Sequence, residues 1–249
     1  MSGASRLTMR SAEGLAVPPL AAAAAPFSLV CAPPILMARF SAPQRTIGWS
    51  LLHPGFATIR DVVWIEVRDC DLPLDVDPAA LLRSKLSEIG LPEALAFMTA
   101  RDVRRHHLGR HRAEDVGAEC LTTVGLGNGE RIGSRRFPRV SVGTINTLVH
   151  VSCPLADGAL VEAVSIVAEA RTTAILETWR PDDGPAITGT GTDCIVVAAP
   201  CEGEPSRWAG LHTAVGESIG ASVYGATLEG VEAWRVEIAQ TSRSRSAVC

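Results

Sequence analysis

Three short segments rich in glycine and threonine carry the side chains that could do chemistry in this chain. They read G-T-I-N at residues 143–146, T-G-T-G-T-D at 188–193 and G-L-H-T at 210–213. Asp193 supplies a carboxylate, His212 supplies an imidazole, and each segment supplies at least one threonine hydroxyl. Glycine lets backbone approach a ligand closely, and the polar groups provide directed hydrogen bonds. We therefore expect the three segments to contribute to a ligand site.

Asp193 is the first candidate for catalysis. If residues 188–193 are extended, then Gly189, Gly191 and Asp193 share one face, and the two glycines clear space in front of the carboxylate. A carboxylate in that position suits a general base or a metal ligand. The alternative is a carboxylate that accepts hydrogen bonds from nearby backbone in a turn.

His212 is the second catalytic candidate, because it stands at or just before the start of an expected helix that runs to about residue 228. The positive end of the helix dipole disfavours imidazolium, so a neutral imidazole suited to acid–base work or metal ligation is expected. The alternative is a histidine that caps the helix. Glu217 follows about 140° further round the helix, which argues against a joint metal pair and leaves it as a substrate contact.

Two asparagines and three threonines complete the candidate site. Asn128 ends a G-L-G-N turn and Asn146 ends the G-T-I-N segment. Their amides could bind the amide groups of a ligand. Thr144, Thr190 and Thr192 are expected to donate hydrogen bonds, with nucleophilic attack by a hydroxyl as the alternative role.

The second half of the chain alternates between strand and helix patterns. Residues 140–152 predict a strand, 157–178 a helix with Asp157 as its N-cap, and 186–199 another strand. The apolar residues of the 157–178 helix reach nearly all round it, so this helix should be covered on two sides. We expect an α/β (or α+β) fold, with a mixed β-sheet layered with helices in two or three layers of a single domain.

The first half predicts a mixture of elements. Residues 101–112 form the only dense basic cluster, interpreted as a solvated turn or alternatively as a patch that faces an anionic part of a ligand. The other expected elements are strands at 35–40, 94–99 and 116–126, a helix or strand at 62–65, a turn at 53–55 and an amphipathic helix at 78–89.

The termini are expected to lie outside the folded domain. Residues 1–34 predict a low-complexity, poorly ordered leader, because prolines interrupt its alanine-rich run; a secretory leader is the alternative. Residues 35–240 form the expected domain. Residues 241–249 predict a frayed tail.

Composition narrows the class of protein. With 249 residues and 47% hydrophobic content, the chain can bury a full core. A net charge of −4 and 4% aromatic residues argue against a nucleic-acid partner, and no apolar run is long enough to span a bilayer. Seven scattered cysteines without a C-x-x-C pair favour free thiols in the cytoplasm.

The motifs, taken in order, resemble the adenosylcobinamide amidohydrolases of corrinoid salvage. Some members of that family have Ser-Asn-Ala where this chain has Gly127, Asn128 and Gly129, which keeps the asparagine but removes the hydroxyl. The matching segments are R-T-I-G-W-S-L-L-H-P-G-F (45–56), T-V-G-L-G-N (123–128), G-T-I-N-T-L-V (143–149), E-A-R-T-T-A (169–174), T-G-T-G-T-D (188–193) and G-L-H-T-A-V-G-E (210–217).

The resemblance implies hydrolysis of the amide between the aminopropanol arm and the corrin ring, with adenosylcobyric acid as product. A small-molecule corrinoid would then be the substrate and the partner. The implied chemistry assigns no cofactor and admits a divalent metal. The alternatives are a corrinoid-binding module without turnover and a metal-dependent hydrolase of another small amide.

Overall fold

The computed structural model describes residues 25–73, 75–134, 143–180 and 184–246. Three α-helices and ten strands occur in these ranges, together with two short 3-10 turns, η1 (Asp69–Asp71) and η2 (Val103–Arg105). The strands are β1 (Phe27–Ala32), β2 (Ile35–Trp49), β3 (Pro54–Glu66), β4 (Leu95–Thr99), β5 (His106–Ala113), β6 (Val116–Val124), β7 (Gly129–Glu130), β8 (Ile145–Val151), β9 (Gly189–Thr190) and β10 (Cys194–Pro200). The helices are α1 (Pro78–Glu88), α2 (Asp157–Thr178) and α3 (Ala214–Ser246).

Eight strands form one mixed sheet in the order β4-β3-β2-β10-β8-β6-β5, and β1 pairs with β2 beside this path. The β3–β4 and β8–β10 pairs are parallel, and the other pairs are antiparallel. Strands β7 and β9 form a separate two-stranded ribbon. The expected α/β class, with a mixed sheet and helices in a single domain, is confirmed.

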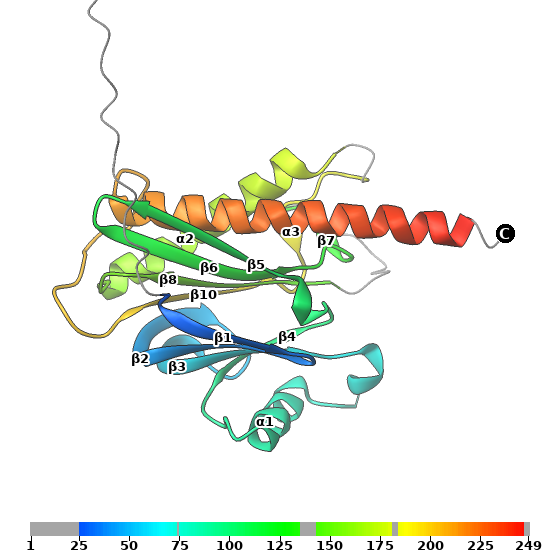
Figure 1. The fold of residues 1–249 in the computed structure, drawn as a ribbon, viewed down its shortest axis with the longest axis horizontal. Coiled ribbons are helices and arrows are strands. Elements are labelled where there is room, and N and C mark those ends of the chain that lie inside the picture. The colour runs from blue at the N-terminus through cyan, green and yellow to red at the C-terminus, as the bar shows by residue number, and fades with distance from the viewer. Residues whose placement is uncertain (1–24, 74, 135–142, 181–183, 247–249) are drawn as a thin grey trace, which may run out of the picture.

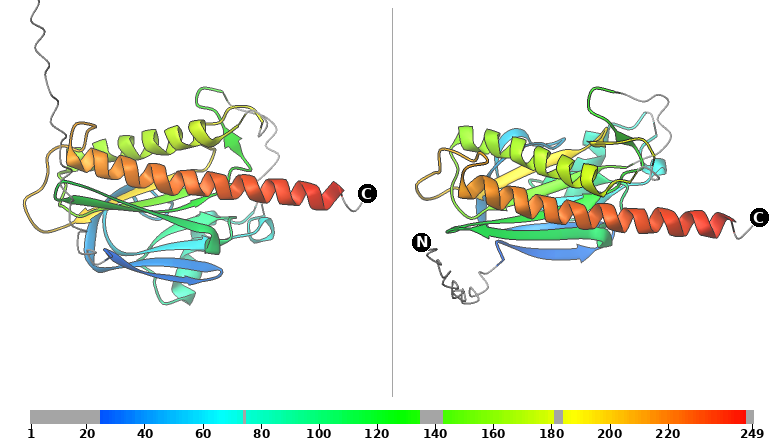
Figure 2. Two further views of the ribbon diagram at one scale, coloured as in Figure 1. Left: turned by 45° about the horizontal axis from the view of Figure 1, so that its top comes forward. Right: turned by 90° about the horizontal axis from the view of Figure 1, so that it is seen from above.

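The sheet folds over on itself, so the molecule has four layers rather than two or three (Figures 1 and 2). Strand β2 has an irregularity in its pairing with β3 between Arg39 and Gln44, which lets the long strand bend. One apolar cluster contains Trp64 and Phe97 from the β1–β4 half and Leu148 from the β5–β10 half. The two halves of the sheet therefore pack face to face.

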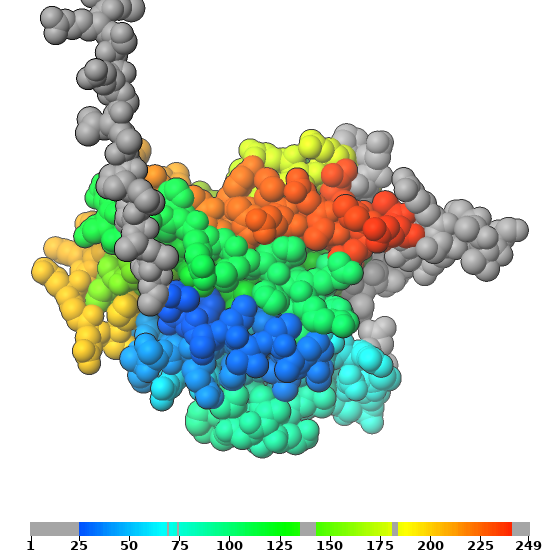
Figure 3. All heavy atoms as spheres, in the orientation of Figure 1, coloured from blue at the N-terminus to red at the C-terminus, as the bar shows by residue number. Residues whose placement is uncertain are grey.

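Helices cover both outer faces of the folded sheet. Helices α2 and α3 pack on the β5–β10 half, where Val149 and Val197 meet Leu160 and Ile219. On the opposite side, Leu82 of α1 and its neighbours pack under β3 and β4. The space-filling view shows the same order, with α3 above the strands and the α1 region below them (Figure 3). Among the described residues, no helix is long and apolar enough to cross a bilayer.

Several expectations about elements are confirmed by the structure, and others are wrong. Residues 101–112 do not form a basic turn: after η2 they enter strand β5, where Arg110 pairs across the ladder with Glu119 at 2.6 Å. Asp157 is the first residue of α2 and pairs with Arg45 at 3.1 Å, whereas Ala156 occupies the N-cap position without a side-chain cap.

The expected domain limits also differ from the structure at both ends. Residues 27–32, placed in the leader by the sequence analysis, form β1, whose register with β2 runs from Phe27 opposite Phe40 to Ala32 opposite Ile35. Phe27 is buried against Phe40 and anchors this strand to the core, whereas the other five residues of β1 are exposed. Residues 241–246, assigned to the tail, continue α3. Residues 1–24 and 247–249 lie outside the described residues.

Candidate functional site

The motif-bearing loops meet at one edge of the sheet. The residues before β8 and β10 share an edge because these strands are parallel. The residues after β6 and after β2 reach the same edge, because β6 runs antiparallel to β8 and β2 runs antiparallel to β10. A pocket of about 700 Å³ opens at this edge. Its wall includes Asn128, Thr144, Asn146, Thr192 and Asp193, together with residues from the end of β2 and from β4.

Asp193 is held by four hydrogen-bond donors. Its carboxylate accepts from the backbone N–H of Ile145 at 3.1 Å, from the backbone N–H of Thr190 at 2.9 Å and from the hydroxyl of Thr190. Arg171, from the middle of α2, adds its guanidinium at 3.0 Å. Each carboxylate oxygen thus accepts two bonds, which uses the acceptor capacity that a general base or a metal ligand would need.

The loop before Asp193 is a turn and not the extended segment that the sequence predicted. Only Gly189 and Thr190 are in a strand, and the chain then turns so that Asp193 bonds back to Thr190. A Cβ on Gly189 would lie 2.6 Å from the carboxylate of Asp193. Gly189 therefore clears space for the carboxylate itself, and the alternative interpretation of Asp193 as a turn carboxylate describes the geometry better.

Hydroxyls and an amide link the loops on the polar wall of the pocket. Thr144 donates its hydroxyl to the carbonyl of Thr192 at 2.7 Å, and Thr192 donates to the carbonyl of Gly143 at 3.0 Å. Asn128 makes one long contact, from its Nδ2 to the hydroxyl of Thr192 at 3.4 Å. Its Oδ1 atom is buried and has no hydrogen-bond partner within the part of the chain that the structure describes. Asn128 can therefore still form hydrogen bonds to a ligand.

Asn146 joins the two halves of the folded sheet. Its Nδ2 donates to the backbone carbonyl of Met98 at 2.8 Å. Met98 belongs to β4, the edge strand of the sheet, so this bond satisfies a carbonyl that lacks a strand partner on that side. Asn146 is buried and lies beside the pocket. Its amide therefore positions the pocket wall, and its nitrogen is already engaged.

His212 and Glu217 lie at the opposite end of the sheet from this pocket. The seven residues of β10, at about 3.3 Å each, separate Asp193 from the loop that carries His212. His212 is exposed, and Thr213, not His212, caps α3 by accepting from the backbone N–H of Gly216 at 3.0 Å. Glu217 is exposed and lies 3.7 Å from the imidazole of His111. The structure does not bring these two predicted residues together with the others.

One further pattern, G-E-S-I-G at 216–220, matches the G-x-S-x-G signature of serine hydrolases and was missed in the sequence analysis. That signature needs a sharp turn between a strand and a helix, whereas Ser218 lies inside α3 and is buried. Its hydroxyl donates to the carbonyl of Val116 at 2.9 Å and accepts from the backbone N–H of Ala113. Ser218 therefore anchors α3 to the β5–β6 hairpin.

Sequence reasoning also assigned no role to several residues that build the site. Trp49 and Ser50, at the end of β2, line the pocket, and Arg171 binds Asp193. The signals were present, since Trp49 and Ser50 fall in the 45–56 motif and Arg171 falls in the 169–174 motif. The contacts themselves join residues more than 20 positions apart, which spacing along the chain does not reveal.

The thiols and the acidic side chains show no sign of nucleophilic or metal chemistry among the described residues. Burial raises the pKa of the Cys194 thiol to about 12, so this pocket residue is a protonated thiol near neutral pH. In the described ranges, no group of three or more His, Cys, Asp or Glu side chains is arranged to hold a metal ion. The six cysteines in these ranges are free thiols.

The fold and site define an α/β protein with a ligand pocket whose polar wall is made mainly of amides and hydroxyls. The family model for adenosylcobinamide amidohydrolase matches residues 22–238, which is most of the chain. The chain therefore belongs to the adenosylcobinamide amidohydrolase family.

Individual proteins show more distant similarity. The uncharacterized protein MJ1613 of Methanocaldococcus jannaschii is 35% identical over 101 residues, which cover 39% of this chain and 39% of that protein. The PH0078 protein from Pyrococcus horikoshii OT3 has a TM-score of 0.41 at 12% identity, over 79% of this chain and 76% of that one. A β-aminopeptidase from a Burkholderia species has a TM-score of 0.38 at 10% identity, over 79% and 78% of the two chains.

Proposed function

We propose that this protein hydrolyses the amide that joins the aminopropanol arm to the corrin ring of adenosylcobinamide, giving adenosylcobyric acid for cobalamin synthesis. The convergence of five of the six matching segments carries the proposal, since 210–217 lies at the other end of the sheet. Segments 45–56, 123–128, 143–149 and 188–193 all contribute to the wall of one pocket, and segment 169–174 supplies the arginine that binds Asp193. A shared pocket is the arrangement expected when separate segments serve one ligand.

The chemistry of the wall supports an amide substrate. Cleavage of an amide needs stabilisation of the oxyanion that develops on its carbonyl oxygen. Asn128 is the best placed donor, because its amide group makes only one long contact at 3.4 Å to a protein atom. Thr144 and Thr192 hold the loops around it, and they also present hydroxyls to an amide-rimmed ligand. A corrinoid carries many such amides, so this wall suits it better than a basic one would.

Asp193 acts as a positioning residue in this proposal. It fixes the backbone of Ile145 and Thr190, and so sets the loops that carry Thr144 and Thr192. The precision of such loops matters, because small displacements of catalytic groups slow reactions strongly. His212 is assigned no catalytic role, since it lies at the other end of the sheet.

The direct test is turnover. The purified protein is incubated with adenosylcobinamide, and adenosylcobyric acid and aminopropanol are sought by mass spectrometry, with and without a chelator. Formation of both products supports the proposal, and an effect of chelation reversed by one metal would add a metal to the mechanism. Binding of the corrinoid without any product would instead identify a corrinoid-binding module. Turnover of other small amides but not of adenosylcobinamide would favour a different hydrolase. The free thiols agree with the cytoplasmic location that we propose.

A further inference from the structure

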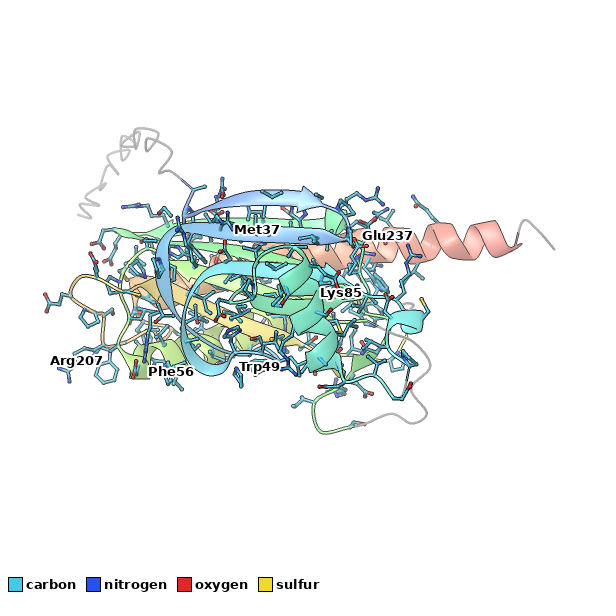
Figure 4. All side chains as sticks on the ribbon, turned by 90° about the horizontal axis from the view of Figure 1, so that it is seen from below. Met37, Trp49, Phe56, Lys85, Arg207 and Glu237 are labelled. Atoms are coloured by element: carbon cyan, nitrogen blue, oxygen red, sulfur yellow. The ribbon has the colours of Figure 1, made fainter. Side chains whose placement is uncertain are left out.

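Trp49 is a large aromatic side chain that is both exposed and fixed. The residue is 47% exposed and lines the pocket. The indole N–H nevertheless donates to the backbone carbonyl of Asp193 at 2.7 Å. Exposed apolar rings carry a solvation cost, so a rigidly held one at a pocket is typical of a binding surface. Figure 4 shows Trp49 and Phe56 along the same outer edge of the molecule.

The backbone brings Trp49 to Asp193 through a close approach of two strands. Gly48, the preceding residue, pairs with Val196 of β10. A Cβ on Gly48 would lie 2.5 Å from the carbonyl oxygen of Ile195, so the approach requires glycine. The indole is therefore held in place before a ligand arrives, which reduces the entropy lost on binding.

Leu51 extends the apolar surface that Trp49 begins. It is 53% exposed and also lines the pocket. Ser50, between them, is buried and bonds to the backbone of His53 in both directions, which fixes this turn. The result is an apolar ledge, formed by Trp49 and Leu51, beside a wall of amides and hydroxyls.

We propose that this ledge supports one face of the conjugated corrin ring while the amide-bearing arm enters the pocket toward Thr144 and Asn128. The inference rests on the proposed function for the identity of the ligand. A corrinoid is larger than the drug-sized ligands that pockets of this volume enclose, so its ring must rest partly at the mouth. Trp49 is then the residue that recognises the ring, and the polar wall recognises the arm.

The test measures the dissociation constant for cobinamide by calorimetry, with the ligand checked for integrity by mass spectrometry. Trp49→Ala is expected to raise the dissociation constant about tenfold or more, the size that stacking on an aromatic ring supports. Trp49→Phe keeps a ring but loses the hydrogen bond, and it should stay within about threefold of the wild type. Equal losses in both variants would overturn the stacking role, because the hydrogen bond would then be the cause.

Two further variants keep the test decisive. Trp208→Ala is the matched control, because Trp208 is 66% exposed yet does not line the pocket. Its neighbour in the sequence, Arg207, lies at the left end of the molecule in Figure 4, away from Trp49. Trp208→Ala should leave cobinamide binding unchanged. Leu51→Asp changes the ledge without touching the indole and should also weaken binding about tenfold. An unchanged affinity in this variant would contradict the ledge even if Trp49→Ala failed to fold.

The choice of ligands separates this inference from the proposed function. Trp49→Ala should raise the dissociation constant for cobinamide that carries a cyano group in place of adenosyl as much as it raises the constant for adenosylcobinamide. A loss confined to adenosylcobinamide would overturn the corrin assignment. If the wild type binds cobinamide through Trp49 but hydrolyses nothing, the ledge stands and the proposed function fails. If the wild type and Trp49→Ala hydrolyse adenosylcobinamide with the same KM, the proposed function stands and the ledge fails.

Discussion

The guanidinium of Arg171, in the middle of α2, lies 3.0 Å from the carboxylate of Asp193, in the loop before β10. The two side chains are only 12% and 9% exposed, so water screens their attraction weakly. The bond connects a helix on the outer face of the sheet with the loop that shapes the pocket. It makes the geometry of the site depend on the packing of α2.

The first prediction concerns this ion pair. Asp193→Asn leaves the guanidinium of Arg171 buried without its partner, which should lower the free energy of unfolding by about 3 kcal/mol. Turnover should fall as well, because the loops around Thr190 and Ile145 lose their anchor. Urea denaturation followed by circular dichroism and the adenosylcobinamide assay measure the two effects.

A double variant distinguishes a positioning residue from a general base. If Asp193 only positions the loop, Arg171→Met together with Asp193→Asn should cost no more activity than either change alone. A general base would give a different pattern. Asp193→Asn would then abolish turnover with little loss of stability, while Arg171→Met would retain most of the activity. That outcome would refute the positioning role and support the interpretation of the Asp193 carboxylate as a general base.

Local patterns in the sequence predicted most of the regular elements. The helix expected at 78–89 is α1, whose N-cap Asp77 accepts from the backbone of Ala79 and Ala80. Along β8, Val149 and Val151 face the helices whereas Leu148 faces the other half of the sheet, as alternation predicts. Such features depend on residues a few positions apart, so the sequence displays them directly.

The fold-over of the sheet and the composition of the site depend on long-range contacts. Pro43 marks a local irregularity between Arg39 and Gln44, but nothing in the local pattern shows that β2 continues beyond it and serves both halves of the sheet. For the same reason, the sequence grouped His212 with Asp193, although the whole of β10 separates them. Distance along the chain is a poor guide here, because Thr144 lines the pocket with Asp193 and His212 does not, although His212 is nearer to Asp193 in the sequence.

The second prediction tests Asn128. Asn128→Ala should lower kcat/KM for adenosylcobinamide about 100-fold, the effect of removing one oxyanion donor from an active site. Stability should change by less than about 1 kcal/mol, because the long contact to Thr192 at 3.4 Å contributes little. Steady-state kinetics and thermal melting of the same preparation measure both quantities. A drop in melting temperature that accounts for the lost activity would argue against the proposed role.

The third prediction concerns His212. Because the side chain is exposed and Thr213 caps the helix, His212→Ala should leave kcat/KM within about twofold and stability within about 0.5 kcal/mol of the wild type. The adenosylcobinamide assay and urea denaturation check these values. A loss of turnover of 100-fold or more in a stable variant would show that the imidazole acts in catalysis after all.

The fourth prediction concerns the pH dependence of stability and the buried His150. Burial lowers the pKa of His150 to about 4 from an ordinary value of 6.5. Its Nε2 lies 3.2 Å from the Oε1 of Gln44, whose amide nitrogen donates to the carbonyl of Ala42. The Oε1 atom therefore accepts, and the imidazole donates as a neutral ring.

The sign of the effect follows from which state binds the proton. Between pH 6.5 and 4 the unfolded chain protonates this imidazole while the folded chain does not, so acidification favours unfolding. The contribution of His150 is fully present above pH 6.5, and about 3 kcal/mol is lost as the pH falls to 4. His107, whose pKa is also lowered by burial, acts in the same direction.

A variant isolates this contribution from those of other groups. His150→Gln keeps an amide donor for Gln44 but cannot titrate, so its free energy of unfolding should fall less steeply than that of the wild type between pH 6.5 and 4. Urea denaturation at half-unit intervals of pH measures both curves. Contributions from His107 and from the carboxylates are common to the two proteins and cancel in the difference, which leaves His150 as the cause. Parallel curves over this range would show that the folded protein accepts a proton on His150 as readily as the unfolded chain does.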